Sequence, residues 1–285
     1  MSCDLHTHSV FSDGILTPAE LLRAAAEKGL SAVALCDHNT VSGLSDFLRA
    51  APAYPVHAVP GVEFSTAYGE GELHIVALFV PQAHFPAVTQ LTELPKRRKL
   101  ESNRRLAARL CEAGYVFDLD ALRAATPNGE VNRAHIAAEL TRRGYTASIN
   151  EAFDTLLIPG GAFYEPPKRL DAFEVIAFIR SIGAVAVLAH PFLNLDAGGL
   201  ERFLPRAVDA GLDAMEVYYA TYDAPTAALA ADFARRHGLL PSGGSDFHGD
   251  NKPDIALGTG HGALDVPDGV YEALRDLAAA RRGRT

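Results

Sequence analysis

Short apolar runs alternate with helical patterns through about the first 80 residues, and this rhythm constrains the fold more than any other feature of the chain. Such a rhythm is typical of successive strand–helix units, which build a mostly parallel sheet. The runs predict strands at residues 3–5, 31–36, 56–64 and 73–79, and the patterns between them predict helices at residues 17–28 and 41–49.

The helix expected at residues 17–28 has clear boundary signals. Thr17 suits the N-cap, Pro18 suits the first helical position, and Glu20 follows the cap by three residues, which is the capping-box pattern. Gly29 comes directly after the last expected helical residue and favours an end there.

The pattern changes between about residues 86 and 164, where one helical stretch follows another. The basic run Lys96-Arg97-Arg98-Lys99 in this part is interpreted as a solvated helix face. The strand–helix rhythm then resumes, with strands expected at residues 184–189, 214–219 and 240–243 and helices at residues 171–181, 200–210 and 226–237. We therefore expect an α/β barrel from residues 1–85 and 165–285, with residues 86–164 as a helical insertion that contributes to the substrate pocket.

The composition of the 285 residues, 48% hydrophobic and 21% charged, is that of a folded protein. The net charge of -9 argues against a broad binding surface for duplex nucleic acid, which depends on clustered lysine and arginine. A small substrate or a single chain end remains compatible with it. The three cysteines, Cys3, Cys36 and Cys111, lack the paired spacing of a zinc ribbon or a redox motif and are interpreted as buried thiols.

The sequence predicts a cytoplasmic enzyme. No basic segment followed by an apolar run opens the chain, and no stretch approaches the roughly 20 apolar residues of a membrane span. We expect no membrane association, and nothing in the sequence indicates a stable protein partner.

Candidate metal ligands begin near the amino terminus, in Asp4-Leu5-His6-Thr7-His8. The two histidines stand two residues apart, so an extended strand points both to one face. A lone pair of strand histidines is more often packed or solvated. Asp13, five residues after His8, and the later clusters favour a preformed chelate instead.

Ionisable residues also follow or interrupt the next apolar runs. Asp37 and His38 come directly after the second run, and the carboxyl ends of parallel strands are where α/β folds place their sites. Glu63 and His74 lie within the next two runs, where burial is costly unless the group is paired or binds a metal. For any one of them, a hydrogen-bonded core residue is the alternative interpretation.

The carboxyl-terminal half repeats this arrangement, because His190 closes one apolar run and Asp246 and His248 follow another. The nine candidate ligands are six imidazoles and three carboxylates: His6, His8, Asp13, His38, Glu63, His74, His190, Asp246 and His248. One zinc ion needs about four ligands. Nine nitrogen and oxygen donors without a thiolate therefore predict two or three divalent ions of zinc, manganese or iron, with Glu63 as the natural bridge.

Such a centre suits the hydrolysis of phosphate esters. Divalent ions make a bound water acidic enough to supply hydroxide near neutral pH, and the same ions neutralise charge on a phosphate oxygen. Asp246 is the candidate catalytic residue that would accept the proton of the attacking water, or it is a ligand only, and the sequence does not separate these roles.

The ordered motifs resemble the polymerase and histidinol phosphatase (PHP) family, a branch of the amidohydrolase-like metal enzymes. They are Asp4-Leu5-His6-Thr7-His8-Ser9, Cys36-Asp37-His38, Ala189-His190-Pro191 and Gly244-Ser245-Asp246-Phe247-His248, and the likeness extends over nearly the whole chain. The resemblance implies a distorted (β/α)7 barrel with a helical insertion, and the nine residues as metal ligands. It also implies that Asp37 holds an imidazole in its ligating tautomer.

Within the insertion, Asn132-Arg133-Ala134-His135 resembles PHP members that act on nucleoside 3',5'-bisphosphates and on the 5' ends of short RNA. This resemblance implies that Arg133 clamps a phosphate and that His135 is a phosphate ligand or general acid. Those nucleotidases carry Gly-Arg after Ala-His-Pro, whereas this chain has Phe192-Leu193, which argues against a bisphosphate substrate. Lys168 is the candidate substrate-binding residue that would compensate.

We therefore expect a metal-dependent hydrolase of phosphate mono- or diesters of a small phosphorylated metabolite, a nucleotide or a ribose phosphate, including a cyclic phosphate. The alternative is a 5'-end-directed exoribonuclease or 3',5'-nucleoside bisphosphate phosphatase. A histidinol phosphatase, a metal module that binds nucleic acid, and a non-catalytic metal-binding protein are less favoured. The complete set of donors argues against the last of these.

Overall fold

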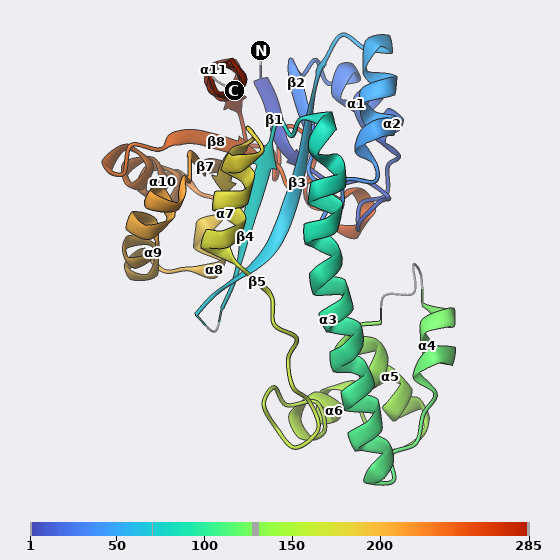
Figure 1. Cartoon of the computed structure of the whole chain (residues 1–285). Helices are drawn as coiled ribbons and strands as arrows, with labels where there is room; N and C mark the ends of the chain where they lie inside the picture. The colour runs from blue at the N-terminus through green and yellow to red at the C-terminus, as the bar shows by residue number, and fades with distance from the viewer. Residues whose placement is uncertain (1, 70, 127–130, 284–285) are drawn as a thin grey trace. The chain divides into compact units, whose positions relative to one another are not determined.

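The computed structural model describes residues 2–69, 71–126 and 131–283 and contains two compact units (Figure 1). Residues 1–92 and 170–285 form the first unit, and residues 93–169 form the second. The division lies a few residues later at each end than the 86–164 expected for the insertion. The first boundary falls inside helix α3 (Phe85–Glu112), close to Pro95, and an uninterrupted helical pattern does not mark such a boundary.

The sheet of the first unit has the strand order β8-β7-β6-β4-β3-β2-β1-β9, and β5 pairs with β3. Neighbours β1–β2, β2–β3, β6–β7 and β7–β8 run parallel, as the strand–helix rhythm predicted. The strands are β1 (Ser2–Thr7), β2 (Ala32–Leu35), β3 (His57–Tyr68), β4 (Gly71–Leu78), β5 (Leu170–Asp171), β6 (Val185–Leu188), β7 (Ala214–Tyr219), β8 (Leu240–Gly244) and β9 (Val266–Pro267).

Strands β3 and β4 depart from a pure strand–helix alternation, because they form a long antiparallel hairpin and β4 also runs antiparallel to β6. A parallel pair needs a crossover of a dozen or more residues, and the segment between β3 and β4 is far too short for one. In the hairpin Glu63 lies opposite Val76 and Ser65 lies opposite His74. Glu63 and His74 are therefore diagonal neighbours on one face of the sheet.

The sheet closes into a barrel where the end of β8 meets β1. The Asp246 N–H donates to the His6 carbonyl at 2.8 Å, and the His8 N–H donates to the Phe247 carbonyl at 2.9 Å. Gly244 makes this approach possible, since a Cβ at that position would lie 2.4 Å from the backbone nitrogen of His6. The distorted (β/α)7 barrel expected from the sequence is thereby confirmed.

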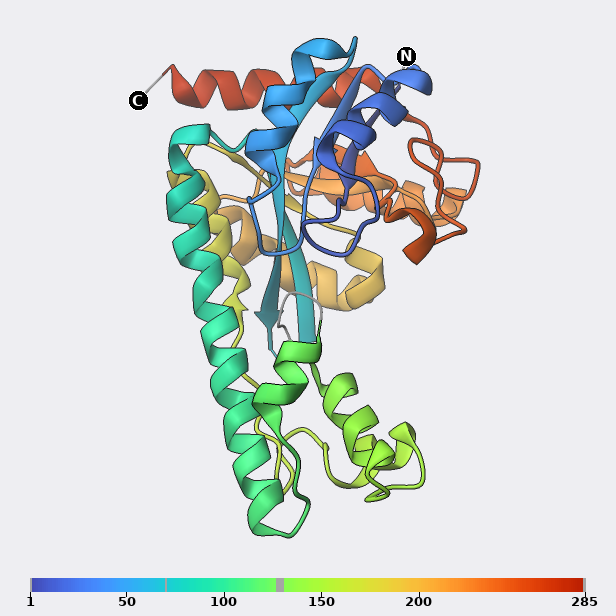
Figure 2. The same cartoon turned by 90° about the vertical axis from the view of Figure 1, so that its right-hand side faces the viewer.

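Helices cover the sheet, and Figure 2 shows α1 and α2 over β2 and β3. The capping box predicted for α1 is present: the Thr17 side chain accepts from the Glu20 N–H, and the Glu20 carboxylate accepts from the Thr17 N–H. The helices of this unit are α1 (Pro18–Glu27), α2 (Leu44–Ala50), α7 (Ala172–Ser181), α8 (Pro191–Asn194), α9 (Ala197–Ala210), α10 (Ala224–Arg236) and α11 (Asp268–Arg282), with short 3-10 turns η1 (Ala51–Ala53), η2 (Gln82–His84) and η4 (Gly249–Asn251).

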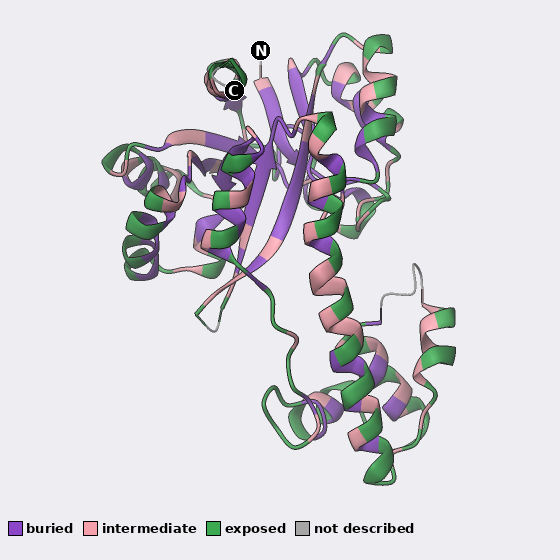
Figure 3. Ribbon diagram, in the orientation of Figure 1, coloured by how far each residue is buried: buried purple, intermediate pink, exposed green. Residues whose placement is uncertain are grey.

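The core of the first unit lies between the strands and α11, which packs against β1, β8 and β9. Val270 and Leu274 of α11 join a buried cluster with Cys3, Ala34 and Val187 from three strands. In Figure 3 the strands are buried along most of their length, whereas the covering helices are buried on one side only. No described helix combines the length and the apolar character needed to cross a bilayer.

The second unit consists of most of α3 together with α4 (Leu119–Ala125), α5 (Arg133–Arg142) and α6 (Ile149–Thr155). Its core joins Leu106 and Leu110 of α3 to Ile136 and Leu140 of α5. Cys111, expected to be a buried thiol, is exposed, because it follows Leu110 in the helix and so points away from the core. Cys3 and Cys36 are buried as expected.

Candidate metal centre

The nine side chains singled out in the sequence converge in the first unit. Six of them come from the carboxyl ends of parallel strands: His6 in β1 and His8 directly after it, His38 after β2, His190 after β6, and Asp246 and His248 after β8. Asp13 lies on the loop after β1, and the long β3–β4 hairpin supplies Glu63 and His74. Parallel strands end at one edge of the barrel, so residues far apart in the sequence meet there.

The carboxylate of Glu63 lies at the centre of this cluster and is fully buried. Five imidazole nitrogens approach its two oxygens: His6 Nε2 at 3.2 Å, His8 Nε2 at 3.3 Å and His38 Nδ1 at 3.0 Å from Oε2, and His74 Nδ1 at 2.8 Å and His190 Nε2 at 3.0 Å from Oε1. Both oxygens therefore have imidazole nitrogens within reach, so this carboxylate and its imidazole neighbours could act together as metal ligands.

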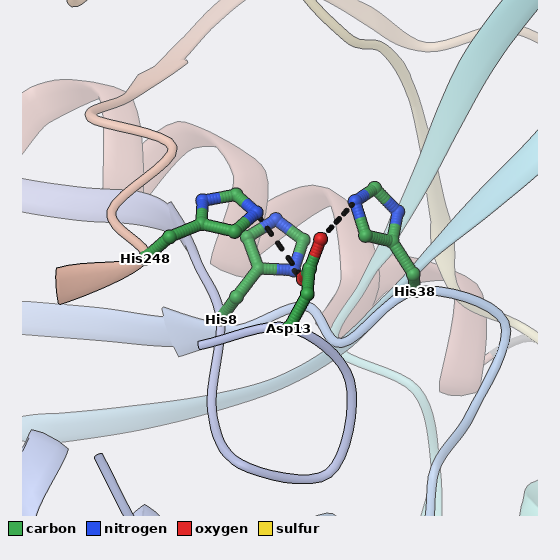
Figure 4. A group of neighbouring side chains, drawn as sticks. All are labelled: His8, Asp13, His38 and His248. Carbon is green, nitrogen blue, oxygen red and sulfur yellow. Dashed lines mark ion pairs between the residues drawn. The ribbon is translucent and has the colours of Figure 1, made fainter. Parts of the chain in front are cut away.

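A second group of donors surrounds Asp13, whose carboxylate lies between the rings of His248 and His38 (Figure 4). Oδ1 is 3.2 Å from His248 Nε2, and Oδ2 is 3.6 Å from His38 Nε2. His8 Nδ1 lies 3.8 Å from Oδ1. His8 and His38 each present one ring nitrogen to Glu63 and the other to Asp13, so they connect the two carboxylates.

Asp246 completes a third group with Glu63, His6 and His8, whose donor atoms all lie within 4.8 Å of one another. Its Oδ1 is 3.1 Å from His8 Nε2. Asp246 and His190 both have positive φ angles, 57° and 28°, which non-glycine residues rarely adopt. Strained backbone of this kind concentrates at functional sites, where the surrounding structure holds it in place.

The donor atoms of the cluster fit divalent ions. Among the described residues, buried polar atoms without a hydrogen-bond partner include His6 Nε2, His8 Nε2, His38 Nδ1, Glu63 Oε2 and His248 Nε2. Buried polar atoms are normally paired, and these five belong to side chains that approach one another around the same carboxylates. Nitrogen and oxygen donors without thiolates suit zinc, manganese or iron. The centre thus contains overlapping groups of ligands able to hold metal ions.

The charges within the cluster shift the ionisation of its members. Burial favours neutral Glu63, but the positive charges of His6 and His38 outweigh this effect and hold the pKa of Glu63 well below its usual range. Burial likewise lowers the pKa of His6, yet the carboxylates of Glu63 and Glu216 raise it well above its usual value. Imidazolium–carboxylate pairing therefore stabilises the metal-free cluster, and metal binding has to displace the protons.

This pairing predicts how the stability of metal-free protein depends on pH. Burial lowers the pKa of His74, but Glu63 and Glu72 outweigh burial and raise it to about 9. A group whose pKa is raised by folding stabilises the folded state fully at pH values below its ordinary pKa, about 6.5 for histidine. This stabilisation is lost as the pH rises through the pKa of the group in the folded protein. We expect the Tm of chelator-treated protein to fall by about 5 °C between pH 7 and pH 9.5.

Thermal melts of chelator-treated protein across this range test the prediction, with His74→Gln as the matched variant whose Tm should change less. Manganese-loaded protein should show the opposite trend, because only neutral imidazoles bind metal. A Tm of the metal-free protein that stays constant or rises would contradict the assignment.

The sequence analysis missed Glu216 of β7, which is buried beside the cluster. Its Oε1 lies 2.8 Å from His6 Nδ1, and its Oε2 accepts the His190 N–H at 2.6 Å. A carboxylate on Nδ1 leaves Nε2 of His6 facing the centre, which is how ligating histidines are oriented. The cue was available, since Glu216 interrupts the apolar run at 214–219 just as Glu63 interrupts an earlier one.

Asp37, expected to hold an imidazole, forms different contacts. Its carboxylate accepts from the Ser9 N–H at 2.8 Å, from the Ser9 hydroxyl at 2.7 Å and from the Ser12 hydroxyl at 2.7 Å. Among the described residues, no imidazole donates a hydrogen bond to Asp37. The loop after β1 turns back beside β2, and this brings Ser9 and Ser12 within hydrogen-bonding distance of Asp37. These hydrogen bonds hold the segment that carries Asp13 in place.

Arg133, expected to clamp a phosphate, is the first residue of α5 in the second unit. Its guanidinium lies over the rings of Tyr164, at 4.9 Å from the centroid, and Phe153, at 5.4 Å. It also donates to the Leu157 carbonyl at 3.3 Å. These contacts hold the guanidinium in a defined position within this unit.

His135 and Lys168 also belong to the second unit. The Nδ1 atom of His135 accepts the Asn132 N–H at 3.2 Å, and the Asn132 side chain accepts the His135 N–H, which completes a capping box at the start of α5. Lys168 is exposed. The structure therefore brings the nine metal-centre candidates together in the first unit, and the three candidate substrate residues lie in the second.

A barrel with a buried imidazole–carboxylate cluster at the ends of its strands defines the class of metal-dependent hydrolases. The chain belongs to the PHP domain family, because the family model matches residues 4–159, more than half of its length. The resemblance drawn from the motifs is thereby confirmed.

Relatives of known activity support a phosphoesterase. The chain is 34% identical to the 5'-3' exoribonuclease Rnm of Salmonella typhimurium over 86% of this chain and 84% of the relative. It is 33% identical to the 3',5'-nucleoside bisphosphate phosphatase of Chromobacterium violaceum, over 97% and 96% of the two chains. It is 32% identical to the phosphoribosyl 1,2-cyclic phosphate 1,2-diphosphodiesterase of Eggerthella lenta, over 86% and 94%. The chain is accordingly a metal-dependent phosphoric ester hydrolase.

A solved structure matches this chain over nearly its whole length. An amidohydrolase from Chromobacterium violaceum, crystallised with bound sulfate and no metal, is 30% identical and covers 97% of each chain with a TM-score of 0.72. The likeness spans both units of this chain, so the insertion as well as the barrel belongs to the shared fold.

Proposed function

We propose that the chain hydrolyses phosphate mono- or diesters of a small phosphorylated metabolite, a nucleotide or a ribose phosphate including a cyclic phosphate, with two or three manganese, zinc or iron ions held by the nine clustered side chains. The observation that supports this proposal most directly is the convergence of five imidazole nitrogens on the buried carboxylate of Glu63. The overlapping groups of donors favour more than one ion. The cytoplasmic location stays a prediction from the sequence.

In this proposal the chain's own residues divide the work between binding the ions and binding the substrate. Bound ions would supply Lewis acidity, which makes water more acidic and neutralises charge on the phosphate. Glu63 would bridge two ions, and Glu216 would keep His6 in its ligating tautomer. Oδ1 of Asp246 faces the ring of His8, among the other candidate metal ligands, and Oδ2 accepts hydrogen bonds from Tyr219 and Lys252. Because Oδ2 is already occupied in this way, the role of metal ligand is favoured over that of general base.

Release of inorganic phosphate tests the proposal. The panel contains sugar phosphates, nucleoside monophosphates and bisphosphates, and cyclic ribose phosphates, each with manganese, zinc or iron and again with chelator. We expect phosphate release from at least one member and its loss with chelator. If no member loses phosphate and no cyclic ribose phosphate is opened to its monoester with any of the three metals, the proposed activity is wrong.

A second candidate, attack at the 5' end of short RNA, is favoured by the second unit. This unit contains 13 lysines and arginines against 10 acidic residues, although the whole chain has a net charge of -9. A cavity of about 230 Å³ in it is lined by Lys96, Arg97, Lys99 and Arg123 together with Glu93. Clustered cations of this kind bind successive phosphates of a single strand.

A 5'-phosphorylated RNA of six nucleotides, compared with a nucleoside bisphosphate, separates the two candidates. An exoribonuclease should lose RNA cleavage when Lys96 and Arg97 are both changed to alanine and should retain cleavage of the bisphosphate. It should also show steeper salt inhibition with RNA, since more phosphates are bound. Equal effects on both substrates would contradict this second candidate.

Arg133→Ala is expected to lower kcat/KM by about 100-fold without changing the amount of bound metal, because a bidentate guanidinium–phosphate contact is lost. Arg142→Ala is the matched control on the same helix: Arg142 is exposed and pairs with Glu139, so its removal should change kcat/KM by less than about twofold.

Thermal melts accompany both variants, since Arg133 also packs on Tyr164 and Phe153. Metal analysis of the same samples provides the second measurement. Parallel loss of metal and activity in Arg133→Ala would show that Arg133 does not act as a phosphate clamp.

A further inference from the structure

Lys252 approaches the metal centre from the segment after β8. It follows the turn η4, and its ammonium lies 2.7 Å from Oδ2 of Asp246. The other oxygen of that carboxylate, Oδ1, faces His8 at 3.1 Å. Among the ion pairs formed between described residues, this one brings a lysine into contact with Asp246, one of the nine candidate ligands.

The backbone at Lys252 is held in place while the side chain reaches solvent. Its N–H donates to the Gly249 carbonyl at 2.9 Å. The neighbouring Asn251 side chain donates to the Asp13 carbonyl at 2.7 Å, which ties this segment to the loop that carries another candidate ligand. The Lys252 side chain is 39% exposed, whereas the Asp246 side chain is only 5% exposed. Lys252 therefore lies at the rim of the centre, where a substrate would arrive.

Asp246 has a second hydrogen-bond donor besides Lys252. The hydroxyl of Tyr219 donates to the same Oδ2 at 2.9 Å, and Tyr219 is buried. One buried neutral donor thus fixes the carboxylate from inside, and the ammonium adds a second donor from the rim. Divalent ions bound at Oδ1 would partly neutralise the negative charge of Asp246 and so weaken its attraction for the ammonium of Lys252. A phosphate carrying up to two negative charges would then be a stronger partner.

We propose that Lys252 binds a phosphate oxygen of the substrate when the phosphate occupies the metal centre. This assignment rests on the proposed function. The flexible four-carbon side chain of a lysine lets the ammonium turn from Asp246 to a bound anion while the backbone keeps its contacts. The first unit then supplies a phosphate-binding cation of its own, in addition to the candidates in the second unit.

Binding of inorganic phosphate to manganese-loaded protein, measured by calorimetry, tests this assignment without turnover. Lys252→Ala should weaken phosphate binding about 10- to 100-fold, because a charge-assisted hydrogen bond is lost. Lys252→Arg should restore most of the affinity. Lys28→Ala, at an exposed lysine after α1, is the control and should change phosphate affinity by less than about threefold. Elemental analysis should show that Lys252→Ala keeps the metal content of the unmodified protein.

The opposite pattern overturns the assignment. Suppose that Lys252→Ala binds less metal, and that the molecules that keep their metal bind phosphate with the affinity of the unmodified protein. Lys252 then only orients Asp246. That outcome leaves the proposed function intact, provided that the unmodified protein releases phosphate from the substrate panel. Conversely, Lys252-dependent phosphate binding by a protein that hydrolyses no substrate of the panel would refute the proposed function and support the binding role.

Discussion

Glu63→Gln is expected to reduce the hydrolysis of phosphate esters by on the order of 1000-fold or more and to remove part of the bound metal. The substitution keeps the size of the side chain but removes its charge and replaces one oxygen by an amide donor. That donor would face imidazole nitrogens that now lie 2.8–3.3 Å from the carboxylate oxygens. A buried neutral amide is a weaker metal ligand than a carboxylate, so metal ions held at Glu63 would be bound less tightly.

Metal content per chain and the rate of phosphate release are the two measurements for this variant. Glu201→Gln is the matched control, since Glu201 makes an exposed ion pair with Arg236 on the same unit. Its rate should stay within about twofold of the unmodified protein. If Glu63→Gln retains full metal content and a rate within tenfold, the bridging role is wrong.

Asp4→Ala is expected to lower the free energy of unfolding of metal-free protein by about 3–5 kcal/mol. Asp4 is fully buried at the seam between β1 and the end of β8. Its carboxylate accepts the Ser245 N–H at 2.9 Å, the Ser245 hydroxyl at 2.5 Å and the Gly258 N–H at 2.8 Å. Alanine leaves these donors buried without partners where the barrel closes.

Urea unfolding of metal-free protein measures this effect apart from metal binding. Asp223→Ala is the matched comparison, because Asp223 is the N-cap of α10 and accepts the Thr226 N–H at an exposed position. Loss of such an exposed cap costs much less than leaving buried donors without partners. An Asp4→Ala variant no less stable than Asp223→Ala would show that the seam does not depend on this carboxylate.

Much of the fold follows from local patterns in the sequence. The strand at residues 214–219 occurs as predicted, and α1 begins with the capping box that Thr17 and Glu20 indicate. The antiparallel direction of β4 also had a cue, since the expected strands left only residues 65–72 between them. The helix α11 and the two-residue strands β5 and β9 were missed, because short strands have little periodicity and α11 follows an irregular segment.

The candidate site was predictable where a ligand-type residue stands at the end of an apolar run, as His38 and His190 do. Residues that support the ligands were harder to identify. Asp37 was assigned to an imidazole, but its contacts with Ser9 and Ser12 depend on how the loop after β1 folds back. Lys252 lies in an irregular segment, and nothing in its sequence neighbourhood indicates contact with Asp246.

The sequence by itself determined which residue types stand at the strand ends, because the alternation of strands and helices and the chemistry of imidazoles and carboxylates are local properties. Only the tertiary structure decided which of these groups meet. Closure of β8 onto β1 brings Asp246 beside His8, and the β3–β4 hairpin places Glu63 among five imidazoles. Such contacts depend on strand order, barrel closure and loop paths, and these are set by the packing of the whole unit rather than by any single segment.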